Sequence, residues 1–245
     1  VDGLVGSEMC IRDRFYSFFL KFPKIFFDVN FYKAFFNKKG IEVGGPSKIF
    51  SKRLPVYKIL KQLDGVNFKE DTLWNQRKKI FEFNKTYIGE QGDLSFIEDD
   101  EFDFLLSSHT LEHSVNPLKV IFEFKRIIKK NGFILLIVPK KENNFDHLRP
   151  ITNFRKLLEI YELKVEEDDL SSLDEILQLH DLDRSPEVGS FENFKKLALN
   201  NFESRILHHH VYDDNLIKKI CEFANLSLIF GETTKHEYIN LLRKT

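Results

Sequence analysis

The sequence has few cysteines and no excess charge of either sign. Its two cysteines, Cys10 and Cys221, lie far apart and form no CxxC pair, which argues against a disulfide framework or a zinc ribbon. Lys and Arg number 37 against 38 Asp and Glu, for a formal net charge of −1. Without a basic field, a nucleic-acid partner is not expected. The composition therefore predicts a protein of a reducing compartment, the cytoplasm, that does not act on nucleic acid.

Long apolar runs are also lacking. The most aromatic segment, residues 15–36, is dense in phenylalanine, but lysines, a proline and an aspartate interrupt it. A membrane span needs about 20 apolar residues in succession, so no stable span is expected. The spacing predicts an aromatic helix that packs on the core of a soluble domain, with an interfacial membrane helix as the alternative.

The first 14 residues, VDGLVGSEMCIRDR, differ from the rest of the chain. They contain its only methionine and lack the bias toward Lys, Asn and Phe that follows. Because they resemble a translated sequencing adapter, we predict a non-native leader over residues 1–14, with a disordered terminus as the alternative. Residues 15–245 are long enough for one α/β domain that carries a helical insertion.

Strand and helix signals alternate after Gly40. Apolar runs at 40–43, 102–108 and 132–139 predict buried parallel strands, because turn residues such as Gly, Asn and Pro punctuate them. Between the last two runs, apolar residues recur at helical spacing and the segment ends in Lys-Lys-Asn-Gly, a typical stop signal for a helix. The pattern predicts a βαβ crossover.

Residues 141–201 break this alternation. They are rich in acidic residues and helix formers and have no strong strand pattern, so we predict a helical insertion packed over the carboxyl edge of the sheet. A helix and two strands, at 226–230 and 237–242, are expected to follow. No low-complexity linker separates these parts, which favours a single domain.

The segment GIEVGGPSKIF places an acid, Glu42, two residues before the pair Gly44 and Gly45. Glycines let a strand-to-helix turn bring its backbone N–H groups close to a ligand. Asp64 follows 22 residues later, about where nucleotide-binding units place the acid that holds a ribose, and Asp93 is placed to accept from an exocyclic amine. The turn lacks the G-x-G-x-x-G spacing, which argues against NAD. The alternatives are a tight structural turn and acids in solvated loops.

The order of the segments IEVGG, LDGVNF, GDLSF, FDFLLSSHTLEH and NPLKVIFEFKRIIKKNGFILLIVP resembles a class I S-adenosylmethionine-dependent methyltransferase domain. More closely, EVGGPS, LDGVNF, FDHLRPIT, LHDLD and HHHVYD resemble an uncharacterised bacterial group of methyltransferase domains. The resemblance covers roughly residues 40–139. It implies an α/β, Rossmann-like, mostly parallel seven-stranded sheet with helices on both faces and an antiparallel last strand.

The resemblance also implies a cofactor, S-adenosylmethionine, and residues that hold it. Gly44 and Gly45 would admit the cofactor, and Glu42 would order their loop. Asp64 would hold the ribose. The adenine contacts would come from Asp93 and Leu94. Where the family has a further glycine, this chain has Pro46 and Ser47, which stiffen the loop.

Histidines follow the run that is expected to end at residue 108. His109 and His113 are four residues apart, so on a helix they would share a face, with Glu112 nearby. They are candidates for a general base or for a pair of metal ligands. The alternative is that Glu112 and His113 only cap and shape the site.

A second group of candidates comes after the run at 132–139. Asp146, His147 and Arg149 stand in NFDHLRPIT, where Arg149 could bind a carboxylate or phosphate of a substrate and His147 could act as a base oriented by Asp146. The alternative is a surface ion cluster. His209, in the run HHHVYDD, is a further candidate for substrate binding.

These observations predict methyl transfer from S-adenosylmethionine to the oxygen or nitrogen of a small polar or sugar-like acceptor. His109, His113 and His147 are the base candidates. No metal is predicted, because the chain has no HExxH spacing. The alternatives are a metal-dependent hydrolase or lyase with His and Asp ligands, and a non-catalytic binding module of the same fold. The sequence predicts no oligomeric state.

Overall fold

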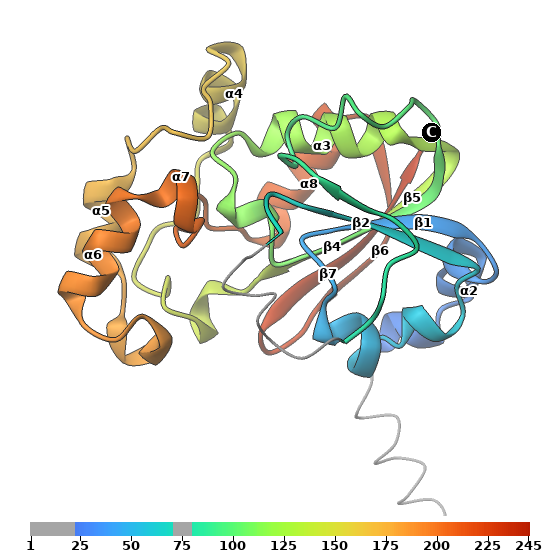
Figure 1. The fold of residues 1–245 in the computed structure, drawn as a ribbon, viewed down its shortest axis with the longest axis horizontal. Coiled ribbons are helices and arrows are strands. Elements are labelled where there is room, and N and C mark those ends of the chain that lie inside the picture. Colours follow the sequence, from blue (N-terminus) through green and yellow to red (C-terminus); the bar gives the residue numbers. More distant parts are fainter. Residues whose placement is uncertain (1–22, 71–79) are drawn as a thin grey trace, which may run out of the picture.

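The computed structural model describes residues 23–70 and 80–245, and within these ranges seven strands form one sheet (Figure 1). In chain order the strands are β1 (Lys39–Val43), β2 (Gln62–Asn67), β3 (Thr86–Ile88), β4 (Phe102–Ser108), β5 (Ile128–Pro139), β6 (Leu226–Thr233) and β7 (Glu237–Lys244). The predicted leader and residues 15–22 of the phenylalanine-rich segment lie outside the described residues.

The strand order is β3-β2-β1-β4-β5-β7-β6. Strands β1 to β5 pair in parallel, and β7 runs antiparallel to both of its neighbours, β5 and β6. The prediction of a mostly parallel seven-stranded sheet with an antiparallel last strand is therefore confirmed. The order also reverses between β1 and β4, where open α/β sheets bind their ligands.

Within residues 23–70 and 80–245 the chain forms seven α-helices. They are α2 (Val29–Phe35), α3 (Pro117–Ile127), α4 (Phe154–Glu162), α5 (Leu173–Leu179), α6 (Phe191–Leu199), α7 (Asn201–Ser204) and α8 (Asp214–Phe223). Short 3₁₀ turns are η1 (Lys24–Phe27), η3 (Val56–Lys58), η4 (Leu111–His113), η5 (Lys141–Asn143), η6 (Leu182–Arg184) and η7 (Pro186–Val188), and η2 (Ile49–Arg53) is a π turn.

Helices cover both faces of the sheet. Along β5, Ile134 and Leu136 join the core under α3 and α8, whereas Leu135 and Ile137 join the core under α2 and the turn η1 (Figure 1). Successive residues of a strand point to opposite faces, so an uninterrupted apolar run is what a strand buried on both sides requires. The apolar run predicted at 132–139 has this role.

Helix α3 shows how the chain sets the length of its elements. The Asn116 side chain accepts from the Lys119 N–H, and Pro117 occupies the first turn, where its missing N–H costs nothing. The helix ends at Ile127 because Ile128 already pairs with Phe102 in the sheet. Strand β5 therefore begins before Gly132, the start that the sequence predicted.

Residues 141–204 contain helices and turns but no strand. They lie beside the sheet, at the left in Figure 1, and hold a small apolar cluster of their own that includes Ile176, Val188 and Phe194. Leu207, beyond the predicted end of the insertion at 201, completes this cluster. The insertion is thus attached to the segment that leads back to α8.

Candidate active site

A cavity of about 440 Å³ lies between the sheet and the insertion. Val43, Asn67 and Pro139, at the carboxyl ends of β1, β2 and β5, line one side of it. Phe145 and Val188 of the insertion line the other. Open α/β sheets bind ligands outside the carboxyl ends of their strands, so this cavity is the candidate site.

The glycine turn forms part of the cavity wall. Gly44 lines the cavity with φ 77°, and a Cβ there would collide with the Thr110 side chain. A Cβ at Gly45 would collide with the carboxyl group of Glu42. Both positions thus need glycine, because the loop packs directly on its neighbours.

Glu42 lies beneath this loop and is fully buried. Its carboxyl group accepts from the Ser47 N–H at 3.0 Å and from the Tyr57 hydroxyl at 2.6 Å. Burial outweighs these hydrogen bonds and raises the pKa of Glu42 to about 7. Glu42 is placed to order the loop, and it is not among the described residues that line the cavity.

The prediction that Asp64 ends the second strand is wrong. Asp64 is the third residue of β2, is 2% exposed and accepts from the Gln62 amide at 3.1 Å. The strand continues to Asn67, which lines the cavity and donates its amide to the carbonyl oxygen of Gly45 at 3.0 Å. Of these two residues of β2, only Asn67 lines the cavity.

Asp93 and Leu94 also lie away from the cavity. Asp93 is exposed and accepts from the Ser95 N–H at 3.2 Å, while Leu94 is buried in the core under α3. The segment that lines the cavity comes earlier, at Gly89, Glu90 and Gln91. Neither of the two residues predicted to contact adenine lines the cavity.

Gln91 shows an unsatisfied polar atom in this wall. Its amide nitrogen donates to the carbonyl oxygen of Thr110 at 2.9 Å. Its Oε1 is buried and has no hydrogen-bond partner within the described residues. A buried acceptor of this kind suits a ligand that brings its own N–H or O–H donor.

Arg149 is a structural tie, which corrects its predicted role as a substrate anchor. The side chain is 2% exposed, and its guanidinium donates to Asp146, Glu175 and the backbone carbonyls of His208 and His209. These partners occupy the guanidinium away from the cavity. The carboxylate of Asp146 is also occupied, because it is hydrogen-bonded to Arg149 and to the Nδ1 of His208.

His147 and His209 do not fit their predicted roles either. The Nε2 of His147 lies 2.7 Å from Asp181, and this pair is outside the cavity wall. His209 is buried, and its Nε2 accepts from the Asn201 amide at 3.0 Å. Burial lowers the pKa of His209 to about 3, so its ring stays neutral.

Four polar residues do meet at the cavity: His109, Glu112, His113 and His208. His109, at φ 55°, is the exposed member, and its Nδ1 lies 3.7 Å from Glu112 Oε1. The rings of His113 and His208 meet edge to face at 4.7 Å. The sequence proposed His109 and His113 but gave His208 no role, because the run HHHVYDD does not tell which histidine points inward.

Glu112 is the least usual member of this group. It is fully buried, and neither carboxyl oxygen has a hydrogen-bond partner within residues 23–70 and 80–245. Its position is fixed by the backbone, because its carbonyl oxygen accepts from the His209 N–H at 2.7 Å. Burial raises the pKa of Glu112.

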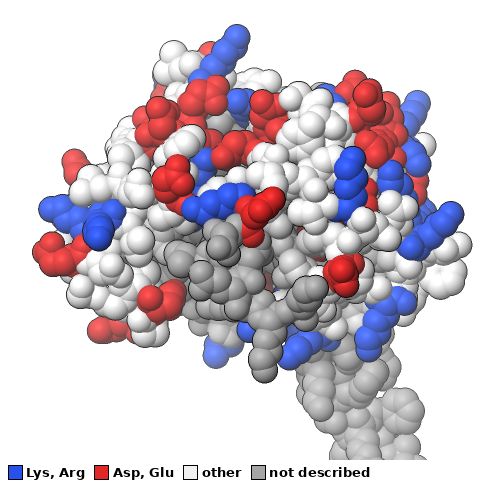
Figure 2. Space-filling view, in the orientation of Figure 1, with Lys and Arg blue, Asp and Glu red and all other residues white. Residues whose placement is uncertain are grey.

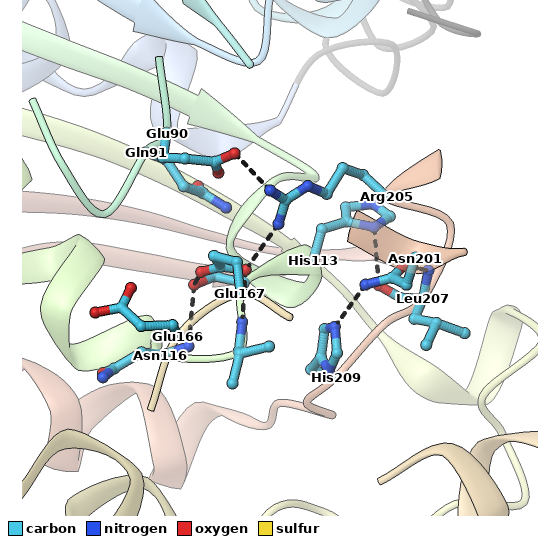
Figure 3. A network of polar contacts seen from close by, with 12 residues as sticks. Glu90, Gln91, His113, Asn116, Glu166, Glu167, Asn201, Arg205, Leu207 and His209 are labelled. Atoms are coloured by element: carbon cyan, nitrogen blue, oxygen red, sulfur yellow. Dashed lines mark hydrogen bonds and ion pairs between the residues drawn. The ribbon is translucent and has the colours of Figure 1, made fainter. Parts of the chain in front are cut away.

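Arg205 joins the insertion to the sheet at the edge of the cavity (Figure 3). Its guanidinium donates to Glu90, in the loop after β3, and to Glu167 at 3.1 Å. The Arg205 side chain is 8% exposed and lies over the rings of Phe68 and Phe202. These contacts hold the insertion against the loop that forms the cavity wall.

Comparison with known proteins agrees with this geometry. The family model described as a methyltransferase domain matches residues 41–136, which run from β1 into β5. The chain carries a methyltransferase domain. Its class is class I, as the sheet order and the family match together indicate, and the cofactor of this class is S-adenosylmethionine.

One curated relative matches a short part of the methyltransferase chain. It is an uncharacterized protein of Methanocaldococcus jannaschii, 44% identical over 52 residues. The match spans 21% of this chain and a quarter, 25%, of the relative.

Solved structures share the fold of most of the chain. A putative methyltransferase from Bacillus halodurans has a TM-score of 0.52 at 12% identity and covers 86% of this chain and 95% of its own. An S-adenosylmethionine-dependent methyltransferase from Mesorhizobium loti has a TM-score of 0.52 at 10% identity and covers 86% and 93%. At these identities the likeness shows the fold alone.

Proposed function

We propose that the chain transfers a methyl group from S-adenosylmethionine to the oxygen or nitrogen of a small polar or sugar-like acceptor. The observation that carries the proposal is the cavity at the carboxyl ends of β1 and β2, with a glycine cradle at Gly44 and unsatisfied acceptors beside it. The cofactor, when bound, supplies an activated methyl group on a sulfonium, so the protein must chiefly align the reactants.

The residues on the sheet side fit the nucleoside part of the cofactor. Gly44 lets the backbone approach without a side chain, and the amide oxygen of Asn67 can accept from a ribose hydroxyl. The buried Oε1 of Gln91 can accept from the exocyclic amine of adenine. In this proposal Asn67 and Gln91 take the hydrogen-bonding roles that the sequence predicted for Asp64 and Asp93. Glu42 and Gly44 keep their predicted roles.

The insertion side fits the acceptor molecule. Phe145 lies between His180 and His208, with ring centroids 4.5 Å and 4.6 Å apart. His109 is the base candidate that is both exposed and at the cavity, whereas His113 is half-buried and His208 is buried. A cavity of about 440 Å³ shared with the cofactor leaves room for a small acceptor only.

The charges on the surface agree with a small-molecule substrate. On the face drawn in Figure 2, basic and acidic side chains of the described residues alternate, as the net charge of −1 leads one to expect. Nucleic-acid binding relies on clustered basic residues. Within residues 23–70 and 80–245, every helix is too short or too polar to cross a membrane.

Calorimetric titration of the full chain with S-adenosylhomocysteine tests the proposal, with NAD as the control ligand. We expect micromolar binding of S-adenosylhomocysteine and none of NAD. Asn67→Ala should weaken binding at least tenfold, since it removes the amide oxygen at the cavity wall. The matched variant Asp64→Asn should bind as the parent does, because Asp64 lies inside the strand. Absence of binding by the folded parent would overturn the proposal.

A further inference from the structure

We propose that Glu112, His113 and His208 bind one divalent transition-metal ion at the wall of the cavity. Each residue offers one ligand atom, and these atoms lie within 4.8 Å of one another. Zinc bonds to nitrogen and oxygen are about 2.0–2.2 Å long, so tetrahedral ligand atoms are about 3.3–3.6 Å apart. Side-chain movements of about 1 Å would therefore close the site around an ion.

Glu112 is the observation that first points to a cation. Its carboxyl group is fully buried, and both oxygens lack a hydrogen-bond donor within the described residues. Buried polar atoms in proteins are nearly always paired, and a buried carboxylate is paired with a cation or a metal. The nearest basic groups are the imidazoles of His109 and His208, whose Nδ1 and Nε2 lie 3.7 Å and 4.0 Å from Glu112 Oε1, beyond hydrogen-bond distance.

Both histidines are held in the orientation that metal ligands need. The Nδ1 of His208 is hydrogen-bonded to the carboxylate of Asp146, which Arg149 holds in turn. The Nδ1–H of His113 donates to the carbonyl oxygen of Leu207 at 3.0 Å. Metal-binding histidines characteristically donate one ring nitrogen to a carboxylate or carbonyl, which fixes the tautomer and the orientation of the ring.

The donor set indicates the kind of metal. Two imidazoles and one carboxylate suit zinc, iron or manganese, and three protein ligands leave a coordination position open, as in catalytic zinc sites. His109 stands next to this position, with its Nδ1 3.7 Å from Glu112 Oε1. It can act as a fourth ligand or receive the proton of a bound group.

The site also bears on the acceptor, a step that rests on the proposed function. All three ligands line the same cavity as the glycine turn. An ion held there would bind a hydroxyl or carboxyl oxygen of the acceptor and lower the pKa of that hydroxyl. The sequence predicted no metal because His208 is far along the chain from Glu112 and His113, and no local spacing links them.

The test uses the full chain after treatment with EDTA and dialysis. Titration with Zn²⁺ alone, against a chromophoric zinc indicator, should give one equivalent bound. Glu112→Gln and His208→Ala should each weaken binding at least 100-fold. Asp146→Asn, which weakens the support of His208 without removing a ligand, should weaken zinc binding about 10–100-fold. His147→Ala serves as the matched control and should bind as the parent does, because the His147–Asp181 pair lies outside the cavity.

Two further measurements keep the result interpretable. Circular dichroism checks that each variant is folded, and Co²⁺ absorption of the parent chain reports nitrogen and oxygen ligands without any substitution. Binding of S-adenosylhomocysteine by the EDTA-treated chain is measured separately, so the cofactor and the metal are tested independently. If the parent binds no Zn²⁺, or if Glu112→Gln binds as tightly as the parent, the proposal is overturned and Glu112 and His208 form only a buried ion pair.

Discussion

The buried carboxyl group of Glu42 predicts an unusual dependence of stability on pH. Its pKa is raised from 4.5 to about 7 in the folded chain. The folded state therefore holds this proton more tightly than the unfolded state does. Stability from Glu42 is fully present below pH 4.5 and is lost as pH rises toward 7.

The size of the effect follows from the shift. At about 1.4 kcal/mol per pKa unit, the rise from 4.5 to about 7 amounts to roughly 3 kcal/mol of unfolding free energy. Burial sets this magnitude, because it penalises the charged form more than the hydrogen bonds from Ser47 and Tyr57 favour it. Glu42→Gln should remove the dependence, since an amide resembles the protonated acid in shape and charge.

Other buried groups make a difference measurement necessary. Burial lowers the pKa of His209 to about 3 and that of His210 to about 4, so these histidines add stability as pH rises toward 6.5. Their contribution opposes that of Glu42 over the same range. It cancels when the parent and Glu42→Gln are compared at each pH.

Urea unfolding of both chains at pH 4.5, 5.5, 6.5 and 7.5 is the assay. The variant should gain about 3 kcal/mol relative to the parent between the lowest and highest pH, in line with the shift to about 7. Glu98→Gln, at an exposed carboxyl group, controls for the loss of one negative charge. A parent-minus-variant difference that stays constant within 0.5 kcal/mol, on the order of the fitting error, would refute the reasoning.

Three further changes have expected outcomes. Arg149→Met should lower the unfolding free energy by roughly 3–5 kcal/mol, because the buried carboxylate of Asp146 loses its guanidinium partner and keeps only His208; a loss below about 1 kcal/mol in urea unfolding would contradict the structural role. Gly44→Ala should weaken S-adenosylhomocysteine binding at least tenfold in calorimetry, because φ is 77° and Thr110 is in the way. Gly189→Ala is its control, with φ 71° but open space around it, and equal losses in both would speak against a local effect. Arg205→Gln should speed amide hydrogen exchange in residues 89–92 severalfold, and unchanged rates would show that the tie to this loop is dispensable.

The parts of the fold that depend on local pattern could be read from the sequence. The run at 132–139 is apolar on both faces, and the strand it predicts is buried on both faces. The glycine turn could be found for a similar reason, because its backbone has φ 77° at Gly44 and glycine adopts a positive φ without strain. Glu42 could be identified together with this turn, because it stands two residues before Gly44 in the sequence.

The predictions that the structure contradicts concern residues whose placement depends on contacts between distant segments. Strand β2 extends to Asn67 because it pairs with β3, where Asn67 stands opposite Ile88, and the local sequence does not encode this partner. Asp64 was therefore placed at a strand end that lies three residues further on. The structural role of Arg149 could not be predicted for the same reason. Its carbonyl partners at His208 and His209 come from the far side of the insertion.

The tie through Arg149 constrains how this chain can evolve new specificities. The same guanidinium anchors the insertion through Glu175 and, through Asp146, orients His208 at the cavity. An insertion borrowed from another enzyme, without a matching Asp146 and Arg149, would thus leave His208 without the contact that orients it. Substitutions should be tolerated best at residues that line the cavity but make none of these Arg149 contacts, such as Phe145 and Val188.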